Sequence, residues 1–420
     1  MLTQYFESPQ RVQGLRAGPA GPFITSFANM LDHGGYAEIT ARRHLRSAEH
    51  LADWADRAGI AIDGPIDRTL EQFDRHLRRG HQCPGRGCRA FGHTFRREIL
   101  HSARLFLNHL AQRGLVSSAP DPRAVPPPPL FVSFCQWMQQ QRGTQASTLS
   151  NYGIHICALL TRLGDDPAAW DASGLRQFVV EGSRTCGWAA AKKRTTALRV
   201  FLRFLIAEGR CASTLDGAIP VLAHWRLASL PRYLPTDEVE RLIRSCDVTV
   251  LVGVRDRAIL LLLARLGLRA GDIVQLQMLD LDWKGGWIRV CGKGRRQTRL
   301  PLTNEVGQAL IAYLKIRPRT SDDAVFVRCR APFRAFRSHC AVSVIVDRAL
   351  SRAGVTRPSR GAAHLLRHSV ATAMLRTGAS LHDVAALLRH RSVSTTQIYA
   401  KVDVVALRKI AQPWPEVQPC

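Results

Sequence analysis

Residues 364–399 read HLLRHSVATAMLRTGASLHDVAALLRHRSVSTTQIY. His364 and Arg367 are three positions apart in a helical apolar pattern, so they lie on one face of a predicted helix. Gly378 interrupts that pattern, and a second short helical pattern ends at His390. Tyr399 follows nine positions later. The stretch therefore predicts two helices, the first of which carries a histidine and an arginine that can converge on one ligand.

Two further basic residues lie at predicted turns upstream. The apolar run 258–264 predicts a buried helix, and Arg269 follows it at a helix–turn–helix junction. Residues 287–291 and 295–302 have the pattern of two β-strands, and Gly292-Lys293-Gly294 is the expected hairpin between them. The chain is poor in lysine, and Lys can release its proton near neutral pH whereas Arg cannot. A lysine at a hairpin tip is therefore informative.

In type and order, these six residues resemble the tyrosine recombinase, or phage integrase, family. The pattern is an Arg after a Gly-Leu pair, a Lys in a Gly-Lys-Gly hairpin, a His-x-x-Arg motif, a later His, and a Tyr nine positions beyond it. The resemblance covers residues 234–411. It implies a mainly α fold with a small antiparallel β-sheet in the catalytic domain (α+β), preceded by helical N-terminal DNA-binding domains.

The resemblance also implies a catalytic set that works without a metal, ATP or any other cofactor. Attack on a DNA phosphodiester develops negative charge on the non-bridging oxygens, which guanidinium groups can stabilise. By resemblance, two arginines clamp the phosphate, the lysine is the general acid, the first histidine assists the nucleophile, and the second hydrogen-bonds the phosphate. The tyrosine forms a covalent 3′-phosphotyrosine link. These residues are Arg269, Arg367, Lys293, His364, His390 and Tyr399.

Several positions depart from the family's pattern without removing a catalytic group. Asp272 stands where the family often has Glu, Arg389 rather than Gly precedes His390, and Ala400 and a lysine follow the tyrosine. An acidic residue at position 272 can orient the catalytic side chains without touching the DNA. It is therefore not counted among the catalytic residues.

The composition points to a polyanionic partner. The 420 residues carry a formal charge of +26 and a pI of about 10.8. Such basicity favours nucleic acid over a membrane surface, without distinguishing DNA from RNA. The family resemblance implies double-stranded DNA. The apolar runs are too short to span a membrane, and the eleven scattered cysteines with no secretory signal pattern suit a reducing compartment. The expected location is the cytoplasm, in association with the nucleoid.

Pro-rich breaks at residues 119–129 and 230–235 divide the chain. The predicted parts are an N-terminal helical DNA-binding (SAM-like) domain over 1–118, a Pro-rich linker over 119–129, a helical core-binding domain over 130–228, a catalytic domain over 229–411 and a C-terminal tail over 412–420.

The first two segments resemble each other, which suggests a duplicated helical unit rather than two unrelated domains. FLNHLAQRG at 106–114 parallels FLRFLIAEG at 201–209, and each ends at a glycine that can stop a helix. Basic residues near these helices are candidate phosphate contacts, although a solvated surface explains each one equally well. The DNA-binding candidates are Arg96, Arg97, Lys192, Lys193 and Arg194, together with Arg295 and Arg296 beside the hairpin.

A loop rich in Gly and Pro carries side chains that zinc prefers. His81, Cys83 and Cys88 lie in this loop, and His93 follows it. The cysteine spacing is unusual for a zinc finger, so a basic loop with buried cysteines is the alternative interpretation.

The predicted function is a site-specific recombinase or integrase that serves a mobile element by integration or transposition. In the family, a tail like residues 402–411 packs on a neighbouring subunit, which implies a homotetramer in the synaptic complex or assembly with related recombinases; packing on its own subunit is the alternative. Two rival functions are a type IB topoisomerase and a non-catalytic DNA-binding protein on the same fold.

Overall fold

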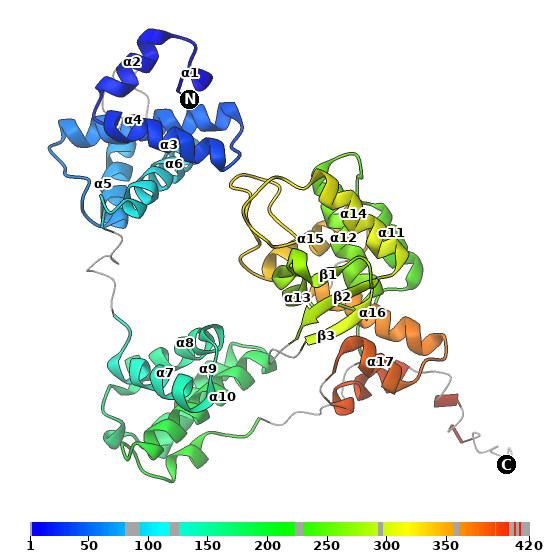
Figure 1. Ribbon diagram of the computed structural model, residues 1–420. Helices are drawn as coiled ribbons and strands as arrows, with labels where there is room; N and C mark the ends of the chain where they lie inside the picture. Colours follow the sequence, from blue (N-terminus) through cyan, green and yellow to red (C-terminus); the bar gives the residue numbers. More distant parts are fainter. Residues whose placement is uncertain are drawn as a thin grey trace, which may run out of the picture. The chain divides into compact units, whose positions relative to one another are not determined.

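The structure, a computed structural model, describes residues 2–79, 93–117, 126–222, 230–292, 297–356, 361–390, 392–402, 407–408 and 411–412. Most of these residues are helical, and one small antiparallel sheet accompanies the later helices (Figure 1). The α+β prediction is therefore confirmed. Three main clusters of buried apolar side chains lie within residues 2–116, 130–219 and 234–366.

The first cluster is built by the N-terminal helices. They are α1 (Leu2–Tyr5), α2 (Pro9–Ala17), α3 (Gly21–His33), α4 (Glu38–Arg57), α5 (Ile66–Arg79) and α6 (His93–Gln112). Helix α4 is strongly amphipathic, and its buried face packs against α3 and α6.

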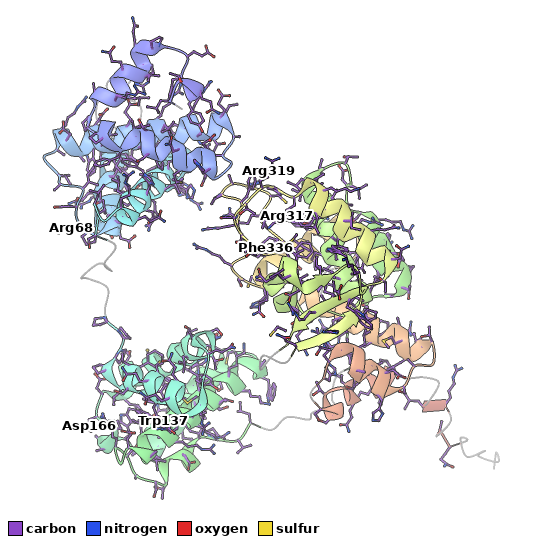
Figure 2. The ribbon with its side chains drawn as sticks, in the orientation of Figure 1. Arg68, Trp137, Asp166, Arg317, Arg319 and Phe336 are labelled. Carbon is purple, nitrogen blue, oxygen red and sulfur yellow. The ribbon has the colours of Figure 1, made fainter. Side chains whose placement is uncertain are left out.

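Residues 119–226 form a compact unit around the second cluster. Its elements are α7 (Pro129–Arg142), α8 (Ala146–Leu163), η1 (Pro167–Ala169), α9 (Ala172–Arg184), α10 (Trp188–Ala207) and η2 (Leu215–Ala218). Asp166 and Asp171 cap η1 and α9 by accepting backbone N–H bonds, which helps to explain why helices start at these points. Figure 2 labels Asp166 in this unit, together with Trp137 of α7, whose ring lies 5.7 Å from that of Phe204.

The two helical groups share one packing scheme. The pairs α3–α4, α3–α6, α4–α6 and α5–α6 are in contact, and so are the corresponding pairs α7–α8, α7–α10, α8–α10 and α9–α10. Phe27 of α3 packs edge-on against Phe106 of α6 with ring centroids 5.1 Å apart, and Phe134 of α7 packs in the same way against Phe201 of α10 at 5.4 Å. This correspondence supports a duplicated helical unit.

The last group of elements surrounds the third cluster and a smaller one that includes Val384, Leu388 and Tyr399. Its helices are α11 (Thr236–Arg244), α12 (Leu251–Arg265), α13 (Ala270–Gln275), α14 (Asn304–Ile316), α15 (Cys340–Arg352), α16 (Ala362–Arg376) and α17 (Leu381–Leu388), with η3 (Met278–Asp280), η4 (Val393–Thr395) and η5 (Gln397–Val402). The strands β1 (Leu281–Asp282), β2 (Trp287–Cys291) and β3 (Gln297–Pro301) form an antiparallel sheet in that order.

Helix α12 is the centre of this part. Its residues from Ala258 to Leu263 are fully buried, as the apolar run predicts, and α12 packs against α14 and α16. After α14, Arg317 ties down the connection to α15 by donating to the carbonyls of Asp322, Ala324 and Val325 at 2.7–3.1 Å. Figure 2 shows Arg317 in this connection with Arg319 and Phe336.

The predicted strand pair is confirmed, with Trp287 opposite Pro301 and Cys291 opposite Gln297. The two-residue strand β1 was not predicted from the sequence, because it is too short to show an alternating pattern. The hairpin tip, most of the Pro-rich linker and most of the tail 402–411 lie outside the described residues. Among the residues described, no helix combines the length and apolar character needed to cross a membrane.

Candidate active site

The two predicted clamp arginines meet at the end of α17. The guanidinium group of Arg367, on α16, donates to the carbonyl oxygens of Gly267 and Leu388. Arg269, the residue before α13, donates through Nη2 to the carbonyl oxygen of Arg389 at 3.5 Å. Arg367 is only 5% exposed, whereas 31% of the Arg269 side chain is accessible. Two guanidinium groups from separate helices therefore converge on adjacent carbonyls.

A close approach between two turns makes this convergence possible. Gly267 has a φ of 59°, in the left-handed region that glycine adopts without strain. A Cβ atom at Gly267 would lie 2.7 Å from Cδ2 of Leu388, so a side chain there would require the Leu388 side chain to shift. The glycine thus allows close packing between the α12–α13 turn and Leu388 at the end of α17.

Tyr399 lies in η5 and is 2% exposed. Its hydroxyl lies 2.8 Å from Nδ1 of His368, on α16. Burial lowers the pKa of His368 to about 4, so the ring is neutral near pH 7 and Nδ1 can accept the tyrosine proton in this hydrogen bond. Burial also raises the pKa of Tyr399 to about 12, although Arg367 acts in the opposite direction. The hydroxyl is therefore held in its protonated form.

The second predicted histidine follows α17. Nδ1 of His390 lies 2.8 Å from Oγ1 of Thr396, which is fully buried. Burial lowers the pKa of His390 to about 4, and Arg367 and Arg269 add to the effect. A neutral His390 with Nδ1 fixed by Thr396 leaves Nε2 for another partner.

His364 lies on α16, one turn before His368. The residue is exposed at the start of the helix, yet partial burial of the ring and the charges of Arg367 and Arg269 hold its pKa below the usual value. His364 and Arg367 share helix α16, as the sequence predicts. Their joint action on one ligand remains a prediction.

Asp272 is the acidic residue at the centre of the site. Its carboxylate accepts the backbone N–H of Arg269 at 2.8 Å and a guanidinium N–H of Arg389 at 2.5 Å. Both side chains of the Asp272–Arg389 pair are 6% exposed. Asp272 thus holds the backbone of Arg269 and the side chain of Arg389, which agrees with the orienting role that the sequence suggests.

Positive charge exceeds negative charge around these residues. Burial lowers the pKa of Arg367 to about 10, and the charges of Arg269 and Arg389 contribute. Asp272 and Tyr399 act in the opposite direction on the same group. Such a cluster of cations favours an anion with several oxygen acceptors, and a phosphate has that chemistry.

Sequence reasoning missed His368 and the contact of Arg389. A signal existed for both: His368 directly follows the His-x-x-Arg motif, and Arg389 occupies the glycine position at a helix stop. Conversely, Lys293, Arg295 and Arg296 lie outside the described residues, so the general acid and the two hairpin contacts remain predictions.

The remaining DNA-contact candidates fall into two groups. Arg97, Lys192 and Lys193 are exposed. Arg96 instead lies 3.0 Å from a carboxylate oxygen of Asp74, and the guanidinium of Arg194 lies 5.7 Å from the centre of the Phe178 ring. The exposed side chains can meet phosphates, although the ammonium group of Lys192 also lies 4.9 Å from the centre of the Trp188 ring. The second group has partners within its own helical unit.

The zinc candidates His81, Cys83 and Cys88 also lie outside the described residues, and His93 is exposed at the start of α6. Within the described ranges, no three His, Cys, Asp or Glu side chains are placed to hold a metal ion. The zinc loop therefore stays a prediction.

Several known proteins resemble this chain in sequence. The phage integrase family matches residues 232–405. The putative integrase/recombinase y4rA of Sinorhizobium fredii is 36% identical over 95% of this chain and 95% of its own length. Tyrosine recombinase XerC of Pelotomaculum thermopropionicum is 36% identical over 53% of this chain and 73% of its own length.

Two solved structures share the fold. The XerH site-specific recombinase in a post-cleavage complex with palindromic difH substrate has a TM-score of 0.53 and 20% identity, covering 83% of this chain and 96% of its own. A lambda integrase (75–356) dimer bound to a COC′ core site has a TM-score of 0.52 and 19% identity, covering 69% and 98%. With a relative 36% identical over nearly its whole length, this chain belongs to the phage integrase family, the tyrosine recombinases, and is an enzyme that breaks and rejoins DNA strands.

Proposed function

We propose that the enzyme cuts one DNA strand with Tyr399 and keeps the 3′-phosphate on that tyrosine until another strand end displaces it. The observation that carries the proposal is the convergence of Arg269 and Arg367 on the carbonyls of Leu388 and Arg389, directly before His390. Tyr399 packs in the same small cluster as α16 and α17. A phosphate held by these groups would lie near the nucleophile.

The proposed reaction has two balanced steps. In the first, the oxygen of Tyr399 bonds to phosphorus while the bond from phosphorus to the 5′ oxygen breaks. In the second, the 5′-hydroxyl of another strand bonds to phosphorus, and the bond to Tyr399 breaks. The two arginines stabilise the negative charge that develops on the non-bridging oxygens, which is the main requirement for catalysis.

Proton transfer needs one base and one acid. His364, whose pKa is below the usual value, is neutral near pH 7 and can take the proton of the tyrosine hydroxyl. Lys293 would give its proton to the leaving 5′ oxygen and recover one in the second step. His390 would donate from Nε2 to the phosphate, with its ring held by Thr396.

The described state is a resting one in this proposal. The Tyr399 hydroxyl is occupied by His368, and the pKa of about 12 disfavours its ionisation. Attack requires the hydroxyl to leave His368 and turn to the phosphate at the arginines. Docking of DNA would drive this change by supplying the anion that the cluster favours.

Double-stranded DNA is the proposed substrate, with the exposed Arg97, Lys192 and Lys193 among its phosphate contacts. Lambda integrase has been solved as a tetramer bound to a Holliday junction. By analogy, this chain would act as a homotetramer at the synapse, in association with the nucleoid. The relatives named integrase/recombinase support a role in integrating or transposing a mobile element.

The test is to map covalent cleavage sites in genomic DNA and then to measure covalent complex formation on a duplex carrying the mapped site. Tyr399→Phe is expected to bind this duplex with unchanged affinity and to form no covalent complex. Tyr233→Phe is the matched control, because Tyr233 packs against Arg376 away from the site. Covalent complex formed by Tyr399→Phe at the unchanged rate would refute the proposal.

The rival functions are separated by two further assays. A type IB topoisomerase would relax a supercoiled plasmid without exchanging strands between two sites, whereas a recombinase joins the two sites. A non-catalytic DNA-binding protein would do neither.

A further inference from the structure

Arg389 stands in an unusual backbone conformation. With φ 52° and ψ 49°, it is the non-glycine residue with positive φ among those the structure describes. Left-handed backbone is unfavourable for a side chain with a Cβ atom, and glycine is the usual residue there. We infer that the contacts of the Arg389 side chain offset the unfavourable backbone conformation.

The side chain of Arg389 turns inward and is 6% exposed. Nη2 donates to the Asp272 carboxylate at 2.5 Å. Nε and Nη1 are buried and have no hydrogen-bond partner among the described residues. Buried donors are nearly always paired, and buried charged donors are costly when they are not. The guanidinium group therefore keeps two unpaired donors, Nε and Nη1, on opposite edges of its plane.

The neighbouring charges indicate which acceptor fits. Arg269 donates to the carbonyl oxygen of Arg389 itself, and the charge of Arg389 acts on Arg367. Asp272 is the carboxylate that touches this group of three guanidinium ions. Three cations around one anion leave a net charge of about +2, which one phosphodiester only partly offsets. A phosphate oxygen suits an unpaired guanidinium donor such as Nη1 in charge and in acceptor chemistry.

We propose that Arg389 is a third phosphate-binding guanidinium of this site, held in place by Asp272, and that it donates through Nη1 to a non-bridging oxygen of the scissile phosphate. The inference rests on the proposed function, because that phosphate is the one clamped by Arg269 and Arg367. In this arrangement Asp272 is a positioning residue: it does not touch DNA but aims Arg389.

The test uses Arg389→Gly, a change that removes the guanidinium and relieves the backbone. The variant is expected to keep the wild-type melting temperature or exceed it, and to bind the mapped duplex nearly as well. Its rate of covalent complex formation should fall about a hundredfold, as for the loss of one preorganised donor to developing charge. Arg244→Ala, which removes one exposed charge from α11, is the control for net charge and should keep the wild-type rate.

A second substrate separates phosphate contact from a structural role. In a duplex with a methylphosphonate at the scissile position, one charged oxygen is replaced by a methyl group. If Arg389 binds that oxygen, the deficit of Arg389→Gly relative to the wild type should shrink at least tenfold on this substrate. An equal deficit on both substrates would mean that Arg389 acts only through the fold.

Two outcomes would overturn the inference: a wild-type cleavage rate for Arg389→Gly, or an undiminished deficit on the methylphosphonate. Both leave the proposed function standing so long as Tyr399→Phe is inactive. Activity of Tyr399→Phe would instead remove the proposed function. Should Arg389→Gly fail to fold, Arg389→Lys serves in the same comparison of substrates, since it keeps the charge and loses the planar guanidinium, which can donate to Asp272 and to a phosphate at once.

Discussion

The Tyr399 hydroxyl and Nδ1 of His368 lie 2.8 Å apart, and their rings are 5.5 Å apart between centroids. Both side chains are held between α16 and η5. Since the nucleophile is engaged in this hydrogen bond, the bond is part of what must be broken before attack. His368 is thus expected to stabilise the resting state at the expense of the cleavage rate.

Replacing His368 with Phe keeps an aromatic ring and removes the hydrogen bond. The resting state should lose about 1 kcal/mol, the net value of such a bond, and covalent complex should form about fivefold faster. Stopped-flow mixing with the mapped duplex and thermal melting measure the two effects. In a Tyr399→Phe background, where the bond is already absent, His368→Phe should cost much less stability. Slower cleavage by His368→Phe would show instead that this histidine takes part in the chemistry.

The stability of the catalytic helices should fall as the pH drops from 7 to 5. The pKa values of His368 and His390 are about 4 in the folded protein, below the ordinary value of about 6.5 in the unfolded chain. Between these values the unfolded chain binds more protons, so acid favours unfolding; above pH 6.5 this contribution is constant. The slope is at most about 1.4 kcal/mol per pH unit for each ring, and less for a ring that solvent screens.

Hydrogen exchange in urea, resolved on peptides from α16 and α17, measures this slope in the catalytic helices alone. His368→Phe should reduce the pH dependence of the free energy of unfolding by up to the contribution of one histidine ring. His44 in α4 also has a pKa of about 4. Hydrogen exchange of α4 therefore provides a reference helix with its own pH dependence, which His368→Phe should leave unchanged. A flat profile for α16 between pH 7 and 5 would contradict the assignment of buried neutral histidines.

Much of the site could be predicted because its residue types recur at fixed intervals on short elements. His364 and Arg367 share a helix turn. The position of Arg269 at the turn before α13 could be predicted from the apolar run and the glycine that precede it. The Asp272–Arg389 contact could not be predicted, since it joins residues 117 positions apart and depends on how closely α13 approaches the end of α17. The His368 bond likewise depends on the path of the chain after His390, which no local pattern determines.

If the two helical units arose by duplication, as their similar packing suggests, they should respond alike to matched core changes. Phe27 and Phe134 are both fully buried, and each packs edge-on against a phenylalanine of the last helix in its unit. Phe27→Ala and Phe134→Ala should each cost about 3–5 kcal/mol through lost burial and a cavity. Because the two cores are separate, limited proteolysis should show new cleavage only within the altered unit. Cleavage spread over both units would contradict independent cores.

Two pairs of adjacent basic residues, one pair on α6 and one on α10, offer a test of which side chains meet DNA. Arg97 and Lys193 are exposed, whereas Arg96 is paired with Asp74 and Arg194 covers Phe178. Each phosphate contact releases counterions, so the logarithm of affinity should fall steeply with the logarithm of salt concentration.

Arg97→Gln and Lys193→Gln should each reduce the slope of this plot by about 0.9, because each removes one neutralised phosphate. Arg96→Gln and Arg194→Gln, the matched controls, should leave the slope unchanged and lower the melting temperature instead, since they remove contacts within a helical unit. Fluorescence anisotropy on the mapped duplex at several salt concentrations measures the slopes. If the exposed pair and the internally paired residues changed the slope equally, exposure would be no guide to the phosphate contacts, and long-range charge would account for the binding.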